Sequence, residues 1–181
     1  MLFQSARIYL RKMTADDVTI YHTWRNDMEV MRTTNPSIDL FTLDSTQEFV
    51  NLGSSTSKSY MIIDKESESS IGIVSLIQID YKNRNAECII DIGEKAYWGK
   101  GYGTEALKLL LDYAFLELNL HRVSLRVFSF NKKAIALYER MGFKHEGILR
   151  EYIFRDGKWS DVFHMGILQR EYVATTAAAG N

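Results

Sequence analysis

Apolar and polar residues alternate along several stretches of the chain, which is the pattern of β-strands with one buried face. Tyr81 to Asn85 forms a polar turn between two of these stretches. Asp156-Gly157 separates the last two, and this pair is typical of a tight hairpin turn. We therefore expect strands over residues 7–11, 60–63, 71–79, 86–92, 123–128, 144–154 and 159–168.

Apolar residues at helical spacing predict two helices in the second half of the chain. The first runs from Thr104 to Leu118 and the second from Lys132 to Met141. Gly142 follows the second helix at the position where a glycine commonly ends a helix.

Capping patterns predict two shorter helices near the N-terminus. Thr14 followed by Asp17 resembles an N-cap with an acid three residues later, and it opens a helix through Tyr21 and Trp24. Residues 45–48 match a capping box for a second short helix.

The order of these elements indicates an α+β fold, with helices flanking one mixed, mostly antiparallel central sheet. A helical pair is followed by an antiparallel meander and then by a β-α-β-α-β-β sequence. We expect a single domain over residues 1–173. Residues 174–181 carry no large apolar side chain, so we expect a disordered tail there.

Composition narrows the class of protein. The chain has 181 residues, with 22 basic and 23 acidic side chains, and this near balance disfavours a protein held on nucleic acid by phosphate contacts. Cys88 is the single cysteine, which excludes an internal disulfide and a multi-cysteine zinc site, and no metal-ligand spacing is visible. No apolar run reaches membrane-helix length and the start lacks a signal-peptide pattern, so we expect a cytoplasmic protein without membrane contact.

Three glycines lie between Trp98 and Thr104, just before the predicted helix. They let the backbone approach a ligand, and the unpaired N–H groups of the helix start favour a phosphate. A tight turn that binds no ligand is one alternative interpretation of this segment. The segment does not match the P-loop pattern. Gly101, Gly103 and Ala106 do match the dinucleotide-binding pattern, but the acidic residue that should follow about 20 residues later is missing. A diphosphate site for coenzyme A is the fourth interpretation.

Two motifs carry a resemblance to a known family. Residues 96–106 (AYWGKGYGTEA) resemble the coenzyme A loop of the GNAT N-acetyltransferases, and residues 131–143 are similar to the N-x-x-A-x-x-L-Y-x-x-x-G-F block of that family. Residues 146–166 and 24–27 are similar to the branch that contains ribosomal-protein alanine and spermidine acetyltransferases. The likeness is clearest from residue 71 to residue 172 and implies a GNAT-like fold.

The resemblance implies acetyl-CoA as cosubstrate, with its diphosphate on the loop and its pantetheine beside the preceding strand, near a bulge at residues 91–93. Asn131 would anchor the cofactor through its amide, and its place before Lys132 also fits a helix N-cap. The expected cofactor-binding residues are Asp91, Ile92, Gly93, Trp98, Gly99, Lys100, Gly101, Tyr102, Gly103, Thr104 and Asn131.

Two further residues are candidates for proton transfer. Tyr138 lies two helical turns after Asn131, and we expect it to protonate the departing thiolate; its alternative is a place on the apolar face of the helix. Glu87 and Asp91 alternate onto one face of a strand. We expect Glu87 to act as the base, and a solvated strand face is the alternative.

We therefore expect an N-acetyltransferase that moves the acetyl group of acetyl-CoA to a primary amine by direct attack. The acceptor is a protein N-terminus, a polyamine or another small amine. A non-catalytic acyl-CoA-binding module is the alternative, and such a module has no need of the Tyr138 phenol. The sequence leaves open whether the chain forms a homo-oligomer.

Overall fold

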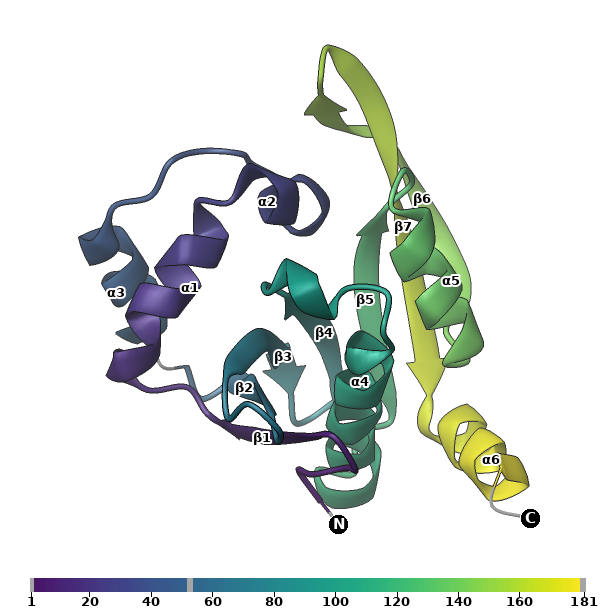
Figure 1. The fold of residues 1–181 in the computed structure, drawn as a ribbon. Coiled ribbons are helices and arrows are strands. Elements are labelled where there is room, and N and C mark those ends of the chain that lie inside the picture. Colours follow the sequence, from purple (N-terminus) through teal and green to yellow (C-terminus); the bar gives the residue numbers. More distant parts are fainter. Residues whose placement is uncertain (1, 52–53, 180–181) are drawn as a thin grey trace. The chain divides into compact units, whose positions relative to one another are not determined.

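The computed structural model describes residues 2–51 and 54–179, which fall into two compact units. The first unit contains residues 1–77 and 89–110, and the second contains residues 78–88 and 111–181. The boundaries between the units fall within strands β3 (Ser70–Asp80) and β4 (Asn85–Ile92) and helix α4 (Tyr102–Asp112). Figure 1 labels these three elements.

The first unit combines N-terminal strands with three helices. Strand β1 pairs antiparallel with β2, which pairs antiparallel with β3. Trp24, Met61 and Ile73 belong to the buried apolar cluster of this unit. Besides parts of β3, β4 and α4, its elements are β1 (Ile8–Lys12), η1 (Ala15–Asp17), α1 (Val18–Arg25), α2 (Met28–Thr34), α3 (Leu43–Asn51), β2 (Lys58–Asp64) and η2 (Lys95–Tyr97).

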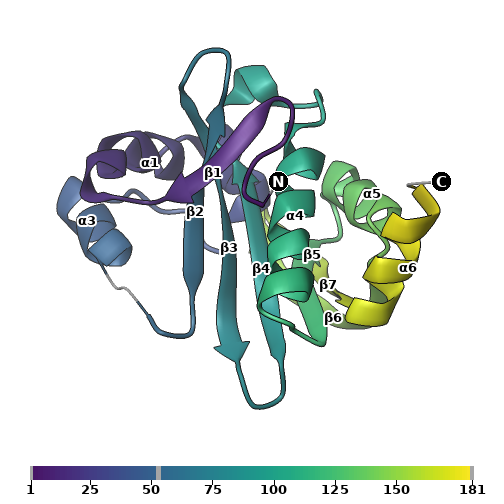
Figure 2. The same ribbon diagram turned by 90° about the horizontal axis from the view of Figure 1, so that it is seen from below.

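The second unit begins with a parallel strand pair. Residues 85–87 of β4 lie opposite residues 122–124 of β5, and β5 pairs antiparallel with β7 (Figure 2). Phe115 and Tyr172 pack together in its interior, with their ring centroids 5.2 Å apart. The further elements of this unit are η3 (Tyr113–Glu117), β5 (Arg122–Phe128), α5 (Lys132–Arg140), β6 (Lys144–Arg155), β7 (Lys158–Leu168) and α6 (Gln169–Ala179).

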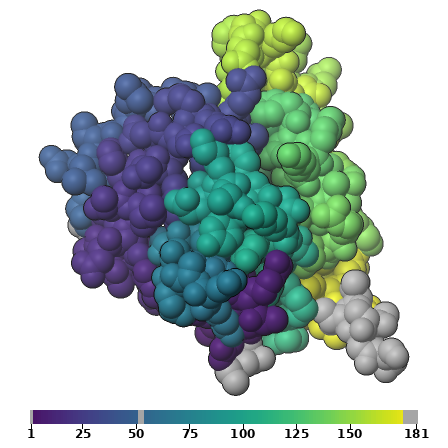
Figure 3. All heavy atoms as spheres, in the orientation of Figure 1, coloured from purple at the N-terminus to yellow at the C-terminus, as the bar shows by residue number. Residues whose placement is uncertain are grey.

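A long hairpin of β6 and β7 ends at Asp156-Gly157, as the sequence predicts. Both turn residues have positive φ, 51° and 73°, which is the conformation of a tight hairpin turn that matches the strand twist. Phe154 and Trp159 flank the turn with their rings 5.0 Å apart, and both are exposed. Figure 3 shows this end of the hairpin at the surface, in yellow-green.

The seven strands follow the order β1-β2-β3-β4-β5-β7-β6. The predicted α+β class with a mostly antiparallel sheet is confirmed. All seven expected strands are present, with ends that differ by at most two residues.

Three parts of the helix prediction were wrong or incomplete. Helix α2 was missed because its seven residues are too few to show an amphipathic repeat. Helix α3 begins at Leu43, and the Thr42 hydroxyl accepts a hydrogen bond from the Ser45 N–H at 3.1 Å, so Ser45 lies inside the first turn and is not the cap. Helix α6 continues through Ala179, into the segment for which we expected a disordered tail; residues 180 and 181 lie outside the described residues. The boundary at residue 173 stays a prediction.

Within residues 2–51 and 54–179, none of the helices is both long and apolar enough to span a bilayer.

Candidate active site

The glycine-rich loop has the geometry of an anion site. Gly99 and Gly101 have positive φ, 72° and 87°, and a Cβ added at Gly99 would meet no atom within 4 Å. Helix α4 follows at once, and its first hydrogen bond runs from the Glu105 N–H to the Gly101 carbonyl at 3.1 Å. The N–H groups of residues 102–104 therefore belong to the first helical turn, where they have no partner within the helix. An open left-handed backbone followed by a helix N-terminus fits the diphosphate of coenzyme A.

Two tyrosines support this loop from beneath. The rings of Tyr97 and Tyr102 meet edge to face at 4.9 Å, and each hydroxyl lies 3.4 Å from the Asp64 carboxylate. Burial opposes ionisation of Asp64, but hydrogen bonds from Ser67 and from both tyrosines hold its pKa below the ordinary value. The loop is therefore anchored on both sides of Gly99 and Gly101.

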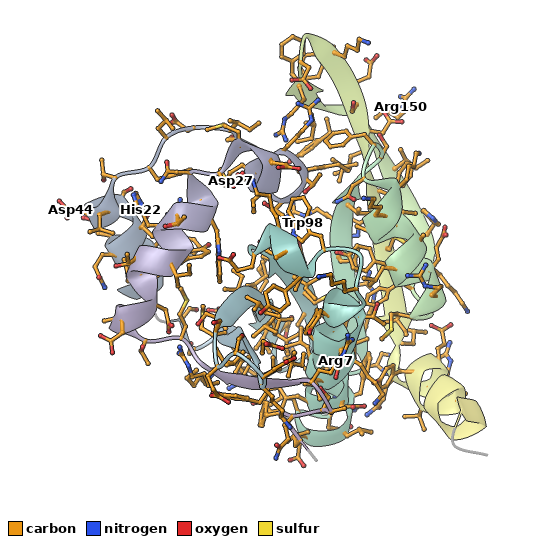
Figure 4. The ribbon with its side chains drawn as sticks, in the orientation of Figure 1. Arg7, His22, Asp27, Asp44, Trp98 and Arg150 are labelled. Atoms are coloured by element: carbon orange, nitrogen blue, oxygen red, sulfur yellow. The ribbon has the colours of Figure 1, made fainter. Side chains whose placement is uncertain are left out.

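Trp98 faces the fold rather than the solvent side of the loop. Its indole N–H donates to the Ile92 carbonyl at 2.7 Å, and its ring packs against the apolar cluster of the first unit. Figure 4 labels Trp98 next to η2, with Asp27 on the neighbouring helix pair. This bond joins the end of β4 to the loop. The side-chain N–H of Trp98 is therefore used to hold the loop backbone and is not available to a ligand.

Gly93 is a glycine because Trp24 covers it. A Cβ at position 93 would overlap the indole ring of Trp24, which is buried and donates its N–H to Glu94 at 2.8 Å. Gly93 is not among the positive-φ residues, so close packing rather than backbone conformation explains it. The same holds for Gly72, where a Cβ would overlap the backbone carbonyl of Asp91.

We expect Gly93→Ala to lower the free energy of unfolding by about 1–3 kcal/mol, because the rigid ring of Trp24 must move and its bond to Glu94 weakens. Urea unfolding followed by circular dichroism measures this change. Gly147→Ala is the matched control, since its added Cβ would meet no atom within 4 Å. Equal stability of the two variants would contradict this account of Gly93.

Asp91 is the acidic residue whose pKa departs most from its ordinary value among the described acids. Burial raises the pKa of its carboxyl to about 7, and its side chain is half-buried. Tyr21 lies close enough to respond: burial raises the pKa of Tyr21 to about 12, with the Asp91 charge acting in the same direction. Among the described residues, no hydrogen bond or ion pair involves the Asp91 carboxylate. A carboxylate of this kind can accept a proton near neutral pH.

Glu87, the expected base, is engaged in an ion pair. Its carboxylate receives the Arg126 Nε–H at 2.9 Å, and its side chain is only 13% exposed. The neighbouring Cys88 is buried, and burial raises the pKa of its thiol to about 12, so the thiol is neutral at pH 7.

Two further acids of the first unit are also paired. Lys95 of η2 contacts the carboxylates of Asp27 at 2.8 Å and Glu29 at 3.1 Å, and Asp27 also caps α2. Hydrogen bonding from Lys95 holds the pKa of Asp27 below its ordinary value. These acids therefore join the segment before the loop to the start of α2. Among residues 2–51 and 54–179, no group of three or more His, Cys, Asp and Glu side chains could hold a metal.

Asn131 and Tyr138 lie on α5 in the second unit. The Asn131 side chain accepts a hydrogen bond from the Ala134 N–H at 3.2 Å, which confirms the N-cap interpretation. Tyr138 is buried on the inner face of α5, and its ring meets Phe143 edge-on at 5.9 Å. Both interpretations of this tyrosine, packing and proton donation, are compatible with that place.

Sequence reasoning missed one residue that shapes the loop. Arg7 lies beside α4 and contacts both Lys100 and Glu105, although it is more than 90 residues away along the chain (Figure 4). No local pattern marks such a long-range contact.

Comparisons with known proteins agree with the motifs. A model of the family described as "Acetyltransferase (GNAT) domain" matches residues 7–144. Spermidine N(1)-acetyltransferase of Vibrio cholerae serotype O1 is 33% identical over 171 residues, which cover 93% of this chain and 97% of that protein. The crystal structure of the V. cholerae spermidine N-acetyltransferase with CoA and spermine has a TM-score of 0.86 at 33% identity and covers 93% of this chain and 99% of that one. A dodecameric structure of spermidine N-acetyltransferase from V. cholerae has a TM-score of 0.80 at 32% identity, covering 93% and 98%.

Proposed function

Since this chain belongs to the GNAT acetyltransferase family and is an acetyl-CoA-dependent N-acetyltransferase, we propose that the amine it acetylates belongs to a polyamine. The observation that carries this proposal is the likeness to spermidine acetyltransferases along almost the whole chain. A protein N-terminus, the other acceptor class expected from the sequence, is the rival.

The residues assigned to the cofactor lie in the first unit, except Asn131, which caps α5 in the second unit. The amides of Gly99, Gly101 and the first turn of α4 would hold the diphosphate, with the Lys100 side chain adding charge. The backbone of Asp91-Ile92-Gly93 would run beside the pantetheine, and Asn131 would contact the cofactor from the cap of α5. When bound, acetyl-CoA supplies the acetyl group as a thioester.

Asp91 is the better candidate for the base than Glu87. A general base works best with a pKa near the working pH. Asp91 has such a pKa, and within the described part of the chain no hydrogen bond or ion pair involves its carboxylate, whereas the Glu87 carboxylate is held by Arg126. In the proposed reaction the amine loses a proton to Asp91 and its nitrogen forms a bond to the thioester carbon. As the C–S bond breaks, the Tyr138 hydroxyl would donate a proton to the sulfur. Asp91 would then release its proton to water and the Tyr138 phenolate would take one up, so both groups return to their starting states.

A homo-oligomer is part of the same proposal. The V. cholerae enzyme forms a dodecamer, and the β6–β7 hairpin of this chain exposes apolar side chains, among them Tyr152, Phe154 and Trp159. The cytoplasmic location expected from the sequence stays a proposal.

The acceptor is tested by following thiol release from acetyl-CoA with spermidine, spermine, amino sugars and short peptides that have free N-termini. We expect spermidine or spermine to give the highest kcat/KM. Release with peptides alone would contradict the polyamine proposal and support the rival acceptor. Binding of coenzyme A with no release for any amine would favour the non-catalytic binding module.

A further inference from the structure

We propose that Arg7 is a positioning residue for the cofactor, which holds the glycine loop in its binding conformation and cancels a negative charge at the start of α4. This inference rests on the proposed cofactor site in the loop. Arg7 lies just before β1, outside the loop and outside both family motifs.

The Arg7 guanidinium joins the middle of the loop to the first turn of the helix. Its Nη1 donates to the Lys100 carbonyl at 3.0 Å, and its Nε and Nη2 both lie 2.8 Å from Glu105 Oε2. The guanidinium also lies over the Tyr102 ring, 4.3 Å from its centroid. Three successive parts of the anion site are therefore held by one planar group.

Gly101 fits the same contact. A Cβ at this position would stand 3.3 Å from Arg7 Nη2, which is a tight approach, and the positive φ of 87° also favours glycine. The Lys100 carbonyl is turned toward Arg7 and accepts its hydrogen bond. Loss of this bond would free the peptide between Lys100 and Gly101 to rotate, and that peptide lies inside the proposed diphosphate site.

Glu105 gives Arg7 a second role, through charge. This acid lies in the first turn of α4, where its carboxylate competes with a bound anion for the positive end of the helix. Burial opposes ionisation of Glu105, but hydrogen bonds from Ser5 and Arg7 hold its pKa below the ordinary value, so it is charged at neutral pH. The ion pair with Arg7 cancels this charge and leaves the helix start available to the diphosphate.

A lysine cannot replace this arginine. The planar fork of a guanidinium reaches a carboxylate and a carbonyl at once and lies flat on an aromatic ring, whereas an ammonium is a single point of charge. Arg7→Lys therefore keeps the charge but loses part of the geometry, and it serves as the variant that preserves folding.

Calorimetric titration with coenzyme A tests the proposal. We expect Arg7→Ala to raise the Kd for coenzyme A about tenfold, which corresponds to about 1.4 kcal/mol, and Arg7→Lys to raise it by a smaller factor. The matched control is Arg11→Ala, because Arg11 makes an equally close pair with Asp17 at 2.6 Å but contacts neither the loop nor α4. The control should lose stability in urea and keep the affinity of the wild type.

Two further measurements separate the roles. In the protein without cofactor, amide hydrogen exchange at residues 99–105 should be faster in Arg7→Ala than in Arg11→Ala. The double variant with Arg7→Ala and Glu105→Gln should recover part of the lost affinity, because the uncompensated charge is gone. A double variant as weak as Arg7→Ala would overturn the charge-cancelling role.

Equal coenzyme A affinity in Arg7→Ala and wild type would overturn the proposal, and so would equal losses in Arg7→Ala and Arg11→Ala. Neither result bears on the identity of the amine acceptor, which is determined by thiol release in the wild type. Conversely, failure to acetylate polyamines would leave a loss of affinity in Arg7→Ala standing.

Discussion

Asp91→Asn is expected to lower kcat/KM about 100-fold and, at the same time, to make the protein more stable above neutral pH. The first effect follows from loss of the proposed base. The second follows from burial, which raises the pKa of Asp91 from its ordinary value of 3.8 to about 7. A residue that costs stability while serving the reaction would show both changes together.

The direction of the pH dependence follows from the raised pKa. Below about pH 4 the Asp91 carboxyl is protonated in both the folded and the unfolded chain and has no effect on stability. As the pH rises from about 4 to about 7, the folded chain keeps this proton while the unfolded chain has lost it, so the free energy of unfolding falls. At pH 8 the Asn variant should therefore exceed the wild type by roughly 2–4 kcal/mol, and at pH 4 the two should be equal.

Urea unfolding at pH 4, 6 and 8 measures the stability, and a pH profile of kcat/KM measures the base. The kcat/KM of the wild type should rise with pH around a midpoint near 7, and the Asn variant should lose this rise, which is the ascending limb of the pH profile. Glu87→Gln is the matched acid-to-amide control on the same strand and should keep the limb. A variant set in which Glu87→Gln loses the limb and Asp91→Asn keeps it would return the base to Glu87.

Tyr138→Phe is expected to lower kcat about 100-fold while the Kd for coenzyme A changes less than twofold. The phenol is the proposed proton donor to the departing thiolate, and its ring packing on Phe143 is kept by phenylalanine. Single-turnover thiol release and calorimetry with coenzyme A give the two quantities.

Tyr172→Phe provides the comparison for a structural tyrosine. Tyr172 is buried in the same unit, and its hydroxyl donates to Asp112 at 2.7 Å. Its loss should lower stability by about 1 kcal/mol and leave kcat unchanged. If Tyr138→Phe behaves in the same way, Tyr138 is a packing residue and the donor lies elsewhere.

The sequence predicts what is encoded locally. The spacing of Gly99 and Gly101 before an amphipathic helix is visible in the chain, and the structure gives both residues the left-handed backbone that this spacing requires. Thr14 and Asp17 likewise form their predicted cap, with the Thr14 N–H donating to Asp17 at 2.8 Å. The alternation of apolar and polar residues predicted the ends of each strand to within two residues.

Contacts between distant residues could not be predicted in this way. Arg7 has no local feature that points to Lys100 and Glu105, and the partner of Glu87 lies on the next strand of the sheet. The sequence places Glu87 and Asp91 on one strand face, and from the sequence we expected Glu87 to be the base and Asp91 to lie beside the cofactor. They differ in their surroundings: Glu87 pairs with the Arg126 guanidinium, whereas the Asp91 carboxylate is shielded by burial and has no hydrogen bond or ion pair with any residue that the structure describes.

The position of Trp98 in the loop means that its intrinsic fluorescence can report on ligand binding there. Of its three indoles, that of Trp24 is buried and that of Trp159 is largely exposed, while Trp98 alone belongs to the loop and is tethered to the end of β4. Replacing Trp159 with phenylalanine would remove the solvent-exposed emitter. Trp24 and Trp98 would then be the two remaining emitters, and a change in their fluorescence on addition of coenzyme A is expected to come from Trp98.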